Sequence, residues 1–216
     1  VKPEEKPVAY MTGGGPASGK SAIEKAGHVK IPKNTVKIDP DDIKKDIPDY
    51  QDLTKKGDVR AASFAHEESS MLSKRVMREA SEGKQPLFLD GTGDGSIESL
   101  RKKVGIMRTG GHRVVANYVT VDTEVAVARN LARYKKTGRM VPENYVRKVH
   151  KEVSNIVPKA MDENLFDELV LWDTNTDGKV IKVMSQIDGK TVVHDKDLWE
   201  KFIAKGDEVI PDTSKL

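Results

Sequence analysis

The chain contains no cysteine among its 216 residues. Disulfides, thiolate metal sites and cysteine nucleophiles are therefore excluded, and a reducing compartment is permitted. No apolar run approaches the roughly 18 residues that a membrane-spanning helix needs. The first residues, 1–7, are charged and proline-rich, which is not the pattern of a signal peptide. We therefore expect a soluble, cytoplasmic protein without a membrane partner.

A strong excess of charge of one sign is also missing. The chain has 37 basic and 34 acidic residues, for a net charge of +3. Non-specific nucleic-acid binding usually needs a clear basic excess, so a nucleic-acid partner is not expected. The length fits one α/β domain with a substantial core. The sequence begins without Met, which is compatible with a piece of a longer polypeptide.

Short apolar segments alternate with helical patterns along most of the chain. Strands are expected at residues 8–12, 35–39, 87–90, 114–121 and 169–172. Helices are expected at residues 20–27, from 40 onward, and at 58–82, 96–109, 123–136 and 142–165. This alternation predicts a three-layer α/β fold, with helices on both faces of a mainly parallel sheet.

The pattern changes after residue 173. A β-hairpin is expected around Asp188-Gly189, followed by a helix over residues 198–204. We therefore expect a flexible lead-in over residues 1–7 and a single domain over residues 8–216. Residues 170–216 would form the last strand, the hairpin and a helical appendage of that domain.

A complete phosphate-binding motif, GGPASGKS, lies between the first strand and the first helix. It matches G-x-x-x-x-G-K-S/T, in which glycines let backbone N–H groups cradle phosphate oxygens. The following helix directs its positive end at the same anion. The alternative is a glycine-rich turn with a chance lysine. The motif predicts ATP and Mg²⁺ as cofactors, with these loop residues as ligands: Gly14, Gly15, Pro16, Ala17, Ser18, Gly19, Lys20 and Ser21. Lys20 is expected to reach the β- and γ-phosphates, and Ser21 the Mg²⁺ ion.

Acidic residues follow the second and third expected strands. After the second strand the chain reads Asp39-Pro40-Asp41-Asp42, and a carboxylate there can accept the proton of an acceptor hydroxyl. The alternative is simple capping of a helix N-terminus. Asp90 follows the third strand and is expected to support Mg²⁺ or its waters, with a strand-end turn as the alternative. Glu67 or Glu68, on the long helix, is a further candidate for contact with a polar substrate, and Glu67 is taken as the first choice.

Three arginines, Arg129, Arg133 and Arg139, surround a short basic segment that ends before Pro142. Arginines on a mobile segment can stabilise the negative charge that develops during phosphoryl transfer. We therefore expect a lid here, with a solvated basic helix face as the alternative.

Together these motifs resemble the zeta-toxin family of P-loop kinases over residues 8–134, and more loosely to residue 183. Ile38-Asp39-Pro40-Asp41 resembles the family's I-D-x-D segment, which implies Asp41 as the catalytic base. Asp90-Gly91-Thr92-Gly93 is similar to the family's E/D-G-T-G, and the resemblance implies that Asp90 and Thr92 lie near the substrate. Ile47 stands where the family often has His.

The resemblance also implies that Arg133 and Arg139 contact the phosphates of ATP. The expected function is transfer of the γ-phosphate of ATP to a hydroxyl of a small molecule. The resemblance implies a nucleotide sugar such as UDP-N-acetylglucosamine, phosphorylated at its sugar 3′-hydroxyl. A polynucleotide 5′-kinase, a non-catalytic nucleotide-binding module of a larger protein and a plain NTPase are the alternatives. An antitoxin or a larger host polypeptide is left open as a partner.

Overall fold

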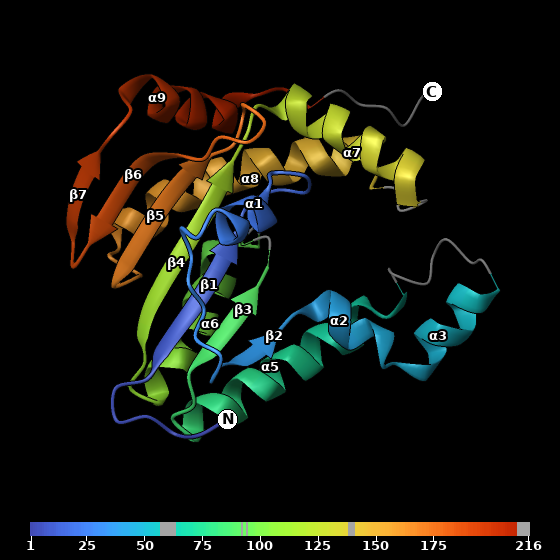
Figure 1. Cartoon of the computed structure of the whole chain (residues 1–216), viewed down its shortest axis with the longest axis vertical. Helices are drawn as coiled ribbons and strands as arrows, with labels where there is room; N and C mark the ends of the chain where they lie inside the picture. Colours follow the sequence, from blue (N-terminus) through green and yellow to red (C-terminus); the bar gives the residue numbers. More distant parts are fainter. Residues whose placement is uncertain (57–63, 92, 94, 138–140, 211–216) are drawn as a thin grey trace. The chain divides into compact units, whose positions relative to one another are not determined.

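The computed structural model of the chain describes residues 1–56, 64–91, 93, 95–137 and 141–210. The described strands form one sheet in the order β2-β3-β1-β4-β5-β6-β7 (Figure 1). They are β1 Val8–Gly13, β2 Val36–Ile38, β3 Leu87–Asp90, β4 Arg113–Thr120, β5 Glu168–Asp173, β6 Ile181–Ile187 and β7 Lys190–Val193. β2 pairs with β3 and β4 with β5 in parallel, whereas the pairings of β6 are antiparallel. The predicted α/β fold class with a mainly parallel sheet and a C-terminal hairpin is confirmed.

Helices connect most of these strands. They are α1 Lys20–Lys25, α2 Pro40–Lys45, α3 Pro48–Lys55, α5 His66–Glu82, α6 Ile97–Thr109, α7 Thr123–Thr137, α8 Glu143–Asp162 and α9 Lys196–Ala204, with a 3₁₀ turn at Lys205–Asp207. The periodicity of the sequence did not predict α3, which begins with Pro48 in the first turn, where a missing N–H costs nothing. The long helix expected from residue 58 is described from His66 onward, and residues 58–63 lie outside the described part of the chain.

The chain divides into two compact units. The first unit consists of Val1–Met11, Ile31–Gly91 and Lys102–Val114. In it, α5 packs against β2, β3 and α2. The helix buries one face through residues spaced three to four apart: Ser69, Ser73, Met77, Ala80 and Ser81. The lead-in is hydrogen-bonded to the same unit, since the N–H of Glu4 donates to Lys84 O at 2.9 Å and the N–H of Lys2 to Asn34 Oδ1 at 3.0 Å.

The second unit consists of Thr12–Lys30, Thr92–Arg101 and Val115–Leu216. Here α8 packs against α7 and α9, and α9 packs against β6 (Figure 1). The buried face of α8 carries Val146, Val149, Val153 and Val157 at helical spacing. Between β4 and β5, the indole N–H of Trp172 donates to Asn117 Oδ1 at 2.9 Å, which satisfies two buried polar groups.

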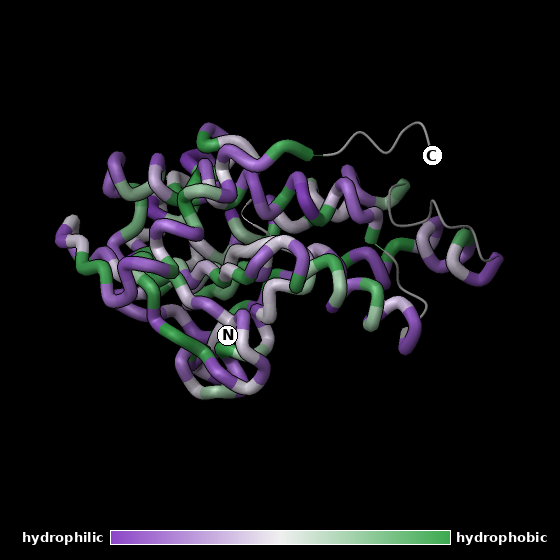
Figure 2. The backbone as a smooth tube through the Cα atoms, turned by 90° about the horizontal axis from the view of Figure 1, so that it is seen from above, coloured by the Kyte–Doolittle hydropathy of each residue, from purple (hydrophilic) through white to green (hydrophobic). Residues whose placement is uncertain are grey.

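None of the helices that the structure describes combines the length and apolar character needed to cross a membrane. Figure 2 shows that hydrophilic residues recur along the described helices, which interrupts any long apolar run.

Candidate functional site

The phosphate loop of the second unit connects β1 to α1. Three of its residues have positive φ angles, with values of 133° at Gly14, 59° at Ala17 and 87° at Gly19. Left-handed conformations interspersed along a short loop turn successive N–H groups toward one concave side, where they can bind an anion. The ammonium of Lys20 folds back over the loop and donates to Gly14 O at 3.1 Å. The sequence motif therefore has the backbone form that phosphate binding needs.

The residues of the loop fit a triphosphate and its metal ion. Among the described residues, the buried hydroxyl of Ser18 has no hydrogen-bond partner. The first turn of α1 carries no acidic residue that would repel an anion. Ser21 lies in that turn with an exposed side chain, so its hydroxyl is free of protein packing. Within the described residues no group of three His, Asp or Glu side chains is placed to hold a metal ion by itself. That arrangement is compatible with Mg²⁺, which usually relies on water and phosphate oxygens for most of its ligands.

Two side chains that sequence reasoning missed touch this loop. The Nε2 atom of His150, on α8, lies 3.0 Å from Pro16 O. The hydroxyl of Thr174, directly after β5, donates to Ser18 O at 2.6 Å. Both residues are far from the loop in sequence, and a histidine inside a helix pattern carries no signal of such a contact. A conserved polar residue on the buried face of α8 would have been the signal to look for in related sequences.

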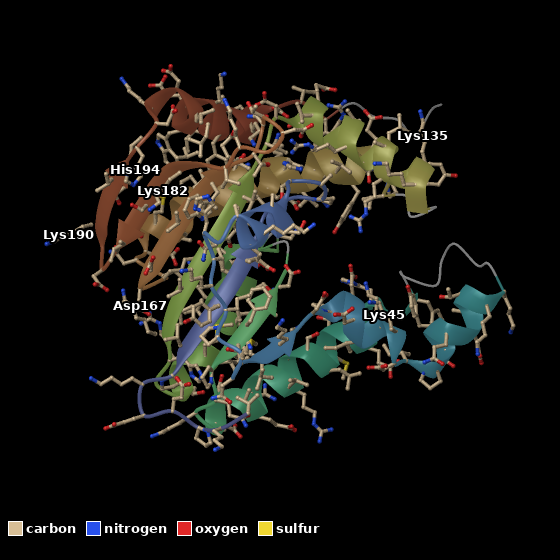
Figure 3. All side chains as sticks on the ribbon, in the orientation of Figure 1. Lys45, Lys135, Asp167, Lys182, Lys190 and His194 are labelled. Atoms are coloured by element: carbon tan, nitrogen blue, oxygen red, sulfur yellow. The ribbon has the colours of Figure 1, made fainter. Side chains whose placement is uncertain are left out.

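The acids predicted after β2 lie together in the first unit, but they have different surroundings. Asp39 is the N-cap of α2, and its carboxylate accepts a hydrogen bond from the N–H of Asp41 at 2.8 Å. The carboxylate of Asp41 lies 3.2 Å from the ammonium of Lys44 and is 47% exposed. Asp42 is exposed and paired with Lys45, which Figure 3 labels on α2. Only Asp39 thus acts as the helix cap that the alternative interpretation described.

Asp90 lies in the same unit as these acids. Because Ile38 and Leu89 are partners in the parallel pairing of β2 and β3, the residues that follow them, Asp39 and Asp90, are neighbours at the carboxyl ends of the two strands. Burial raises the pKa of Asp39, and the negative charge of Asp90 raises it further, against the hydrogen bond from Asp41 N–H that lowers it. A cation or a hydrogen-bond donor placed here would therefore stabilise the ionised carboxylate of Asp39.

The other predicted residues are distributed over both units. Glu67 lies exposed in the first turn of α5 in the first unit. Arg133 is exposed on α7 in the second unit, two residues before Lys135, which Figure 3 labels. Arg129, on the same helix, donates to Thr174 O at 2.7 Å and pairs with Asp177. Thr92 and Arg139 lie outside the described residues.

The position where the family often has His is buried in this chain. Ile47 is only 3% exposed and precedes α3. An apolar side chain fits that interior position, so any polar contact that a histidine would offer there is replaced by packing.

A family model described as Zeta toxin matches residues 1–198 of the chain. The chain belongs to the zeta toxin family. A curated zeta toxin of Streptococcus pyogenes is 21% identical over 225 residues, which cover all of this chain and 76% of the relative. Zeta toxins are kinase-like toxins that use ATP.

Two solved structures share the fold of this zeta toxin family member. The PezAT chromosomal toxin–antitoxin system of Streptococcus pneumoniae aligns with a TM-score of 0.72 and 16% identity, over 93% of this chain and 78% of that one. AvrRxo1-ORF1:-ORF2, solved with ATP, aligns with a TM-score of 0.69 and 18% identity, over 96% of this chain and 66% of that one. At these identities the likeness shows the fold alone.

Proposed function

We propose that the protein is a Mg²⁺-dependent phosphotransferase that moves the γ-phosphate of ATP to a hydroxyl of a small molecule. The first candidate acceptor is a nucleotide sugar such as UDP-N-acetylglucosamine. The observation that carries the proposal is the phosphate loop, in which Gly14, Ala17 and Gly19 adopt positive φ and Lys20 folds back to Gly14 O. The ATP in the AvrRxo1-ORF1:-ORF2 structure supports the choice of nucleotide.

The loop and the arginines would act on the phosphates. In the proposal, the N–H groups of residues 14–21 hold the phosphate oxygens and Lys20 neutralises charge between the β- and γ-phosphates. Arg133 and Arg139 would stabilise the charge on the transferred group. Ser21 would hold Mg²⁺, which when bound offsets the negative charge of the phosphates.

Among the acids of the first unit, Asp41 is the best candidate for the general base. Asp39 is engaged in capping α2, and the side chain of Asp42 is more exposed than that of Asp41, at 67% against 47%. The Asp41 carboxylate is about half exposed, so an acceptor hydroxyl can reach it. Asp39, Glu67, Asp90 and Thr92 would contact the acceptor.

The acceptor class is tested by measuring ADP release from ATP and Mg²⁺ in the presence of three panels: nucleotide sugars, nucleosides and short oligonucleotides. Lys20→Ala is the blank, because it keeps the loop glycines and removes the phosphate-binding ammonium. We expect release that depends on a nucleotide sugar and on Lys20. Release only with oligonucleotides would replace this proposal with a polynucleotide kinase, and ATP binding without release on any panel would replace it with a non-catalytic binding module.

We also propose a protein antitoxin as a partner, since PezAT is a toxin–antitoxin system. The test is expression in bacterial cells. Growth arrest by the wild type and normal growth with Lys20→Ala would support a toxin that needs an antitoxin, whereas equal growth with both would contradict it.

A further inference from the structure

Two carbonyl groups of the phosphate loop are engaged by side chains of the same unit. Pro16 O contacts the Nε2 atom of His150 at 3.0 Å, and Ser18 O accepts a hydrogen bond from the hydroxyl of Thr174 at 2.6 Å. His150 is 2% exposed and Thr174 is 4% exposed, so water does not compete for these carbonyls. Hydrogen bonds therefore hold the loop at two peptide groups, the one after Pro16 and the one after Ser18.

The contacts that fix these two carbonyls also fix the direction of two N–H groups. A peptide unit is planar and trans, so the C=O of one residue and the N–H of the next point in opposite directions. Holding Pro16 O toward His150 directs the N–H of Ala17 away from His150. Holding Ser18 O toward Thr174 directs the N–H of Gly19 away from Thr174. A peptide that turned over would instead present a carbonyl oxygen to the phosphate, and the two would repel each other.

Arg129 supports the same threonine. The guanidinium of Arg129 lies 3.3 Å from Thr174 Oγ1 and 2.7 Å from Thr174 O. A guanidinium only donates, so the threonine hydroxyl accepts from it and has its single proton left for Ser18 O. Asp177 pairs with Arg129 at 2.7 Å on its exposed side and completes the support.

His150 is equally fixed. A Cβ atom on Gly15 would lie 2.4 Å from the imidazole ring, so the ring packs directly on the loop backbone. Burial lowers the pKa of His150 to about 4, which leaves the ring neutral at physiological pH. A neutral ring can donate to Pro16 O only as the tautomer protonated at Nε2. The position therefore needs a neutral donor of this shape, and histidine supplies it.

We infer that His150 and Thr174 are positioning residues of the phosphate loop, which hold the N–H groups of Ala17 and Gly19 toward the phosphates before ATP arrives. This inference rests on the proposed function, because it concerns the same nucleotide. Neither residue touches ATP in the proposal, so their contribution is to pre-organise the loop and reduce the cost of ordering it on binding.

The inference is tested by calorimetric titration of the full chain with ATP and Mg²⁺. Thr174→Val keeps the volume and removes the hydroxyl, and His150→Phe keeps the ring and removes the donor. Each should raise the Kd for ATP roughly tenfold, the usual cost of leaving a buried acceptor unpaired. Thr174→Ser and His150→Gln retain a donor and should restore much of the affinity. Partial unfolding lowers the binding stoichiometry instead of the affinity, so the two effects are separated in one titration.

Matched controls are a buried threonine and a buried histidine with other hydrogen-bond partners. The hydroxyl of Thr123 donates to Glu208 Oε2 at 2.9 Å, and the ring of His112 lies 2.9 Å from Met107 O and 2.8 Å from Gln85 O. Thr123→Val and His112→Phe lose these buried hydrogen bonds and should leave the Kd unchanged. If Thr174→Val does not fold, Thr174→Ala removes the same hydroxyl and should also raise the Kd.

Three outcomes decide the matter. A higher Kd for the loop variants with an unchanged Kd for the controls supports the inference. Wild-type affinity in folded Thr174→Val and His150→Phe overturns it and leaves the proposed function intact. A wild type that does not bind ATP overturns the proposed function, and this inference falls with it.

Discussion

The phosphate loop of the second unit and the acidic cluster of the first unit are built in different ways. The loop is held by side chains that lie 134 and 156 residues away in sequence and are almost fully buried. The acids interact with their own helix: Asp39 with the N–H of Asp41, Asp41 with Lys44, and Asp42 with Lys45. The described contacts of His150 and Thr174 with the loop come from the tertiary fold, whereas these three contacts of the acids are local.

This difference has a functional consequence. Buried hydrogen bonds are costly to leave unmade, whereas exposed ion pairs contribute about 0–1 kcal/mol and are screened by salt. The nucleotide would therefore meet a preformed loop. The acceptor would meet side chains that can rearrange at small cost, so the acceptor class can differ among proteins that share the same loop.

The largest effect is expected from Asp41→Asn, which would break the acidic cluster at its proposed base. Loss of a general base should lower kcat by about 10²–10⁴-fold, since the amide cannot take the proton of the acceptor. Binding of ATP should change little, because the proposed role of Asp41 is to take a proton from the acceptor and not to hold the phosphates. The measurements are kcat with the acceptor found by the ADP-release screen and the Kd for ATP by calorimetry.

Asp42→Asn is the matched control for that experiment. It removes a carboxylate one residue away that is exposed and paired with Lys45. It should leave kcat near the wild-type value. Equal losses in the two variants, or a parallel loss of ATP affinity in Asp41→Asn, would show that the acids act through general electrostatics and not through a base.

A second effect concerns His150 beside the loop, whose burial should make the free energy of unfolding fall at acid pH. The pKa of His150 is about 4 in the folded protein and about 6.5 in the unfolded chain. Between these values the unfolded state binds more protons, so the free energy of unfolding rises with pH from about 4 to about 6.5. A displacement of this size corresponds to roughly 3 kcal/mol of stability, fully present above pH 6.5 and lost as the pH falls to 4.

Urea denaturation of the wild type and of His150→Gln at several pH values measures this contribution. The variant has no titrating group at this position, so the difference in unfolding free energy between the two proteins should shrink or reverse as the solution is acidified. A constant difference from pH 7 to pH 4 would mean that the ring is not buried against the loop as described.

The contrast between the two regions also explains what could be predicted from the sequence. The loop motif and the strand before it are encoded within a few residues, so spacing and turn chemistry were enough to find them. The strand Leu87–Asp90 was predicted with its observed bounds because the apolar run and the glycines after it are equally local.

What could not be predicted depends on tertiary structure. His150 lies in an ordinary amphipathic pattern, and its contact with Pro16 O exists only because α8 packs beside the loop. Arg129 was expected in a lid, but its role as a support for Thr174 depends on the position of the chain after β5. The helix α3 was missed because its apolar face is short and its starting proline resembles a turn.

The smallest expected effect compares the same capping interaction in the two units. Asp39 caps α2 by accepting from Asp41 N–H, and Asp195 caps α9 by accepting from Leu198 N–H at 3.0 Å. Replacing an N-cap aspartate by alanine costs about 1 kcal/mol. Burial and the negative charge of Asp90 both disfavour the ionised carboxylate of Asp39 and raise its pKa. Asp39→Ala removes these unfavourable interactions together with the cap, so its net loss of stability should be smaller. We therefore expect Asp195→Ala to lower the free energy of unfolding more than Asp39→Ala in urea denaturation at pH 7.

The order of the two variants should reverse in the acceptor KM, which only Asp39→Ala should raise. A larger stability loss in Asp39→Ala with an unchanged acceptor KM would make Asp39 a structural cap alone and remove it from the proposed acceptor site.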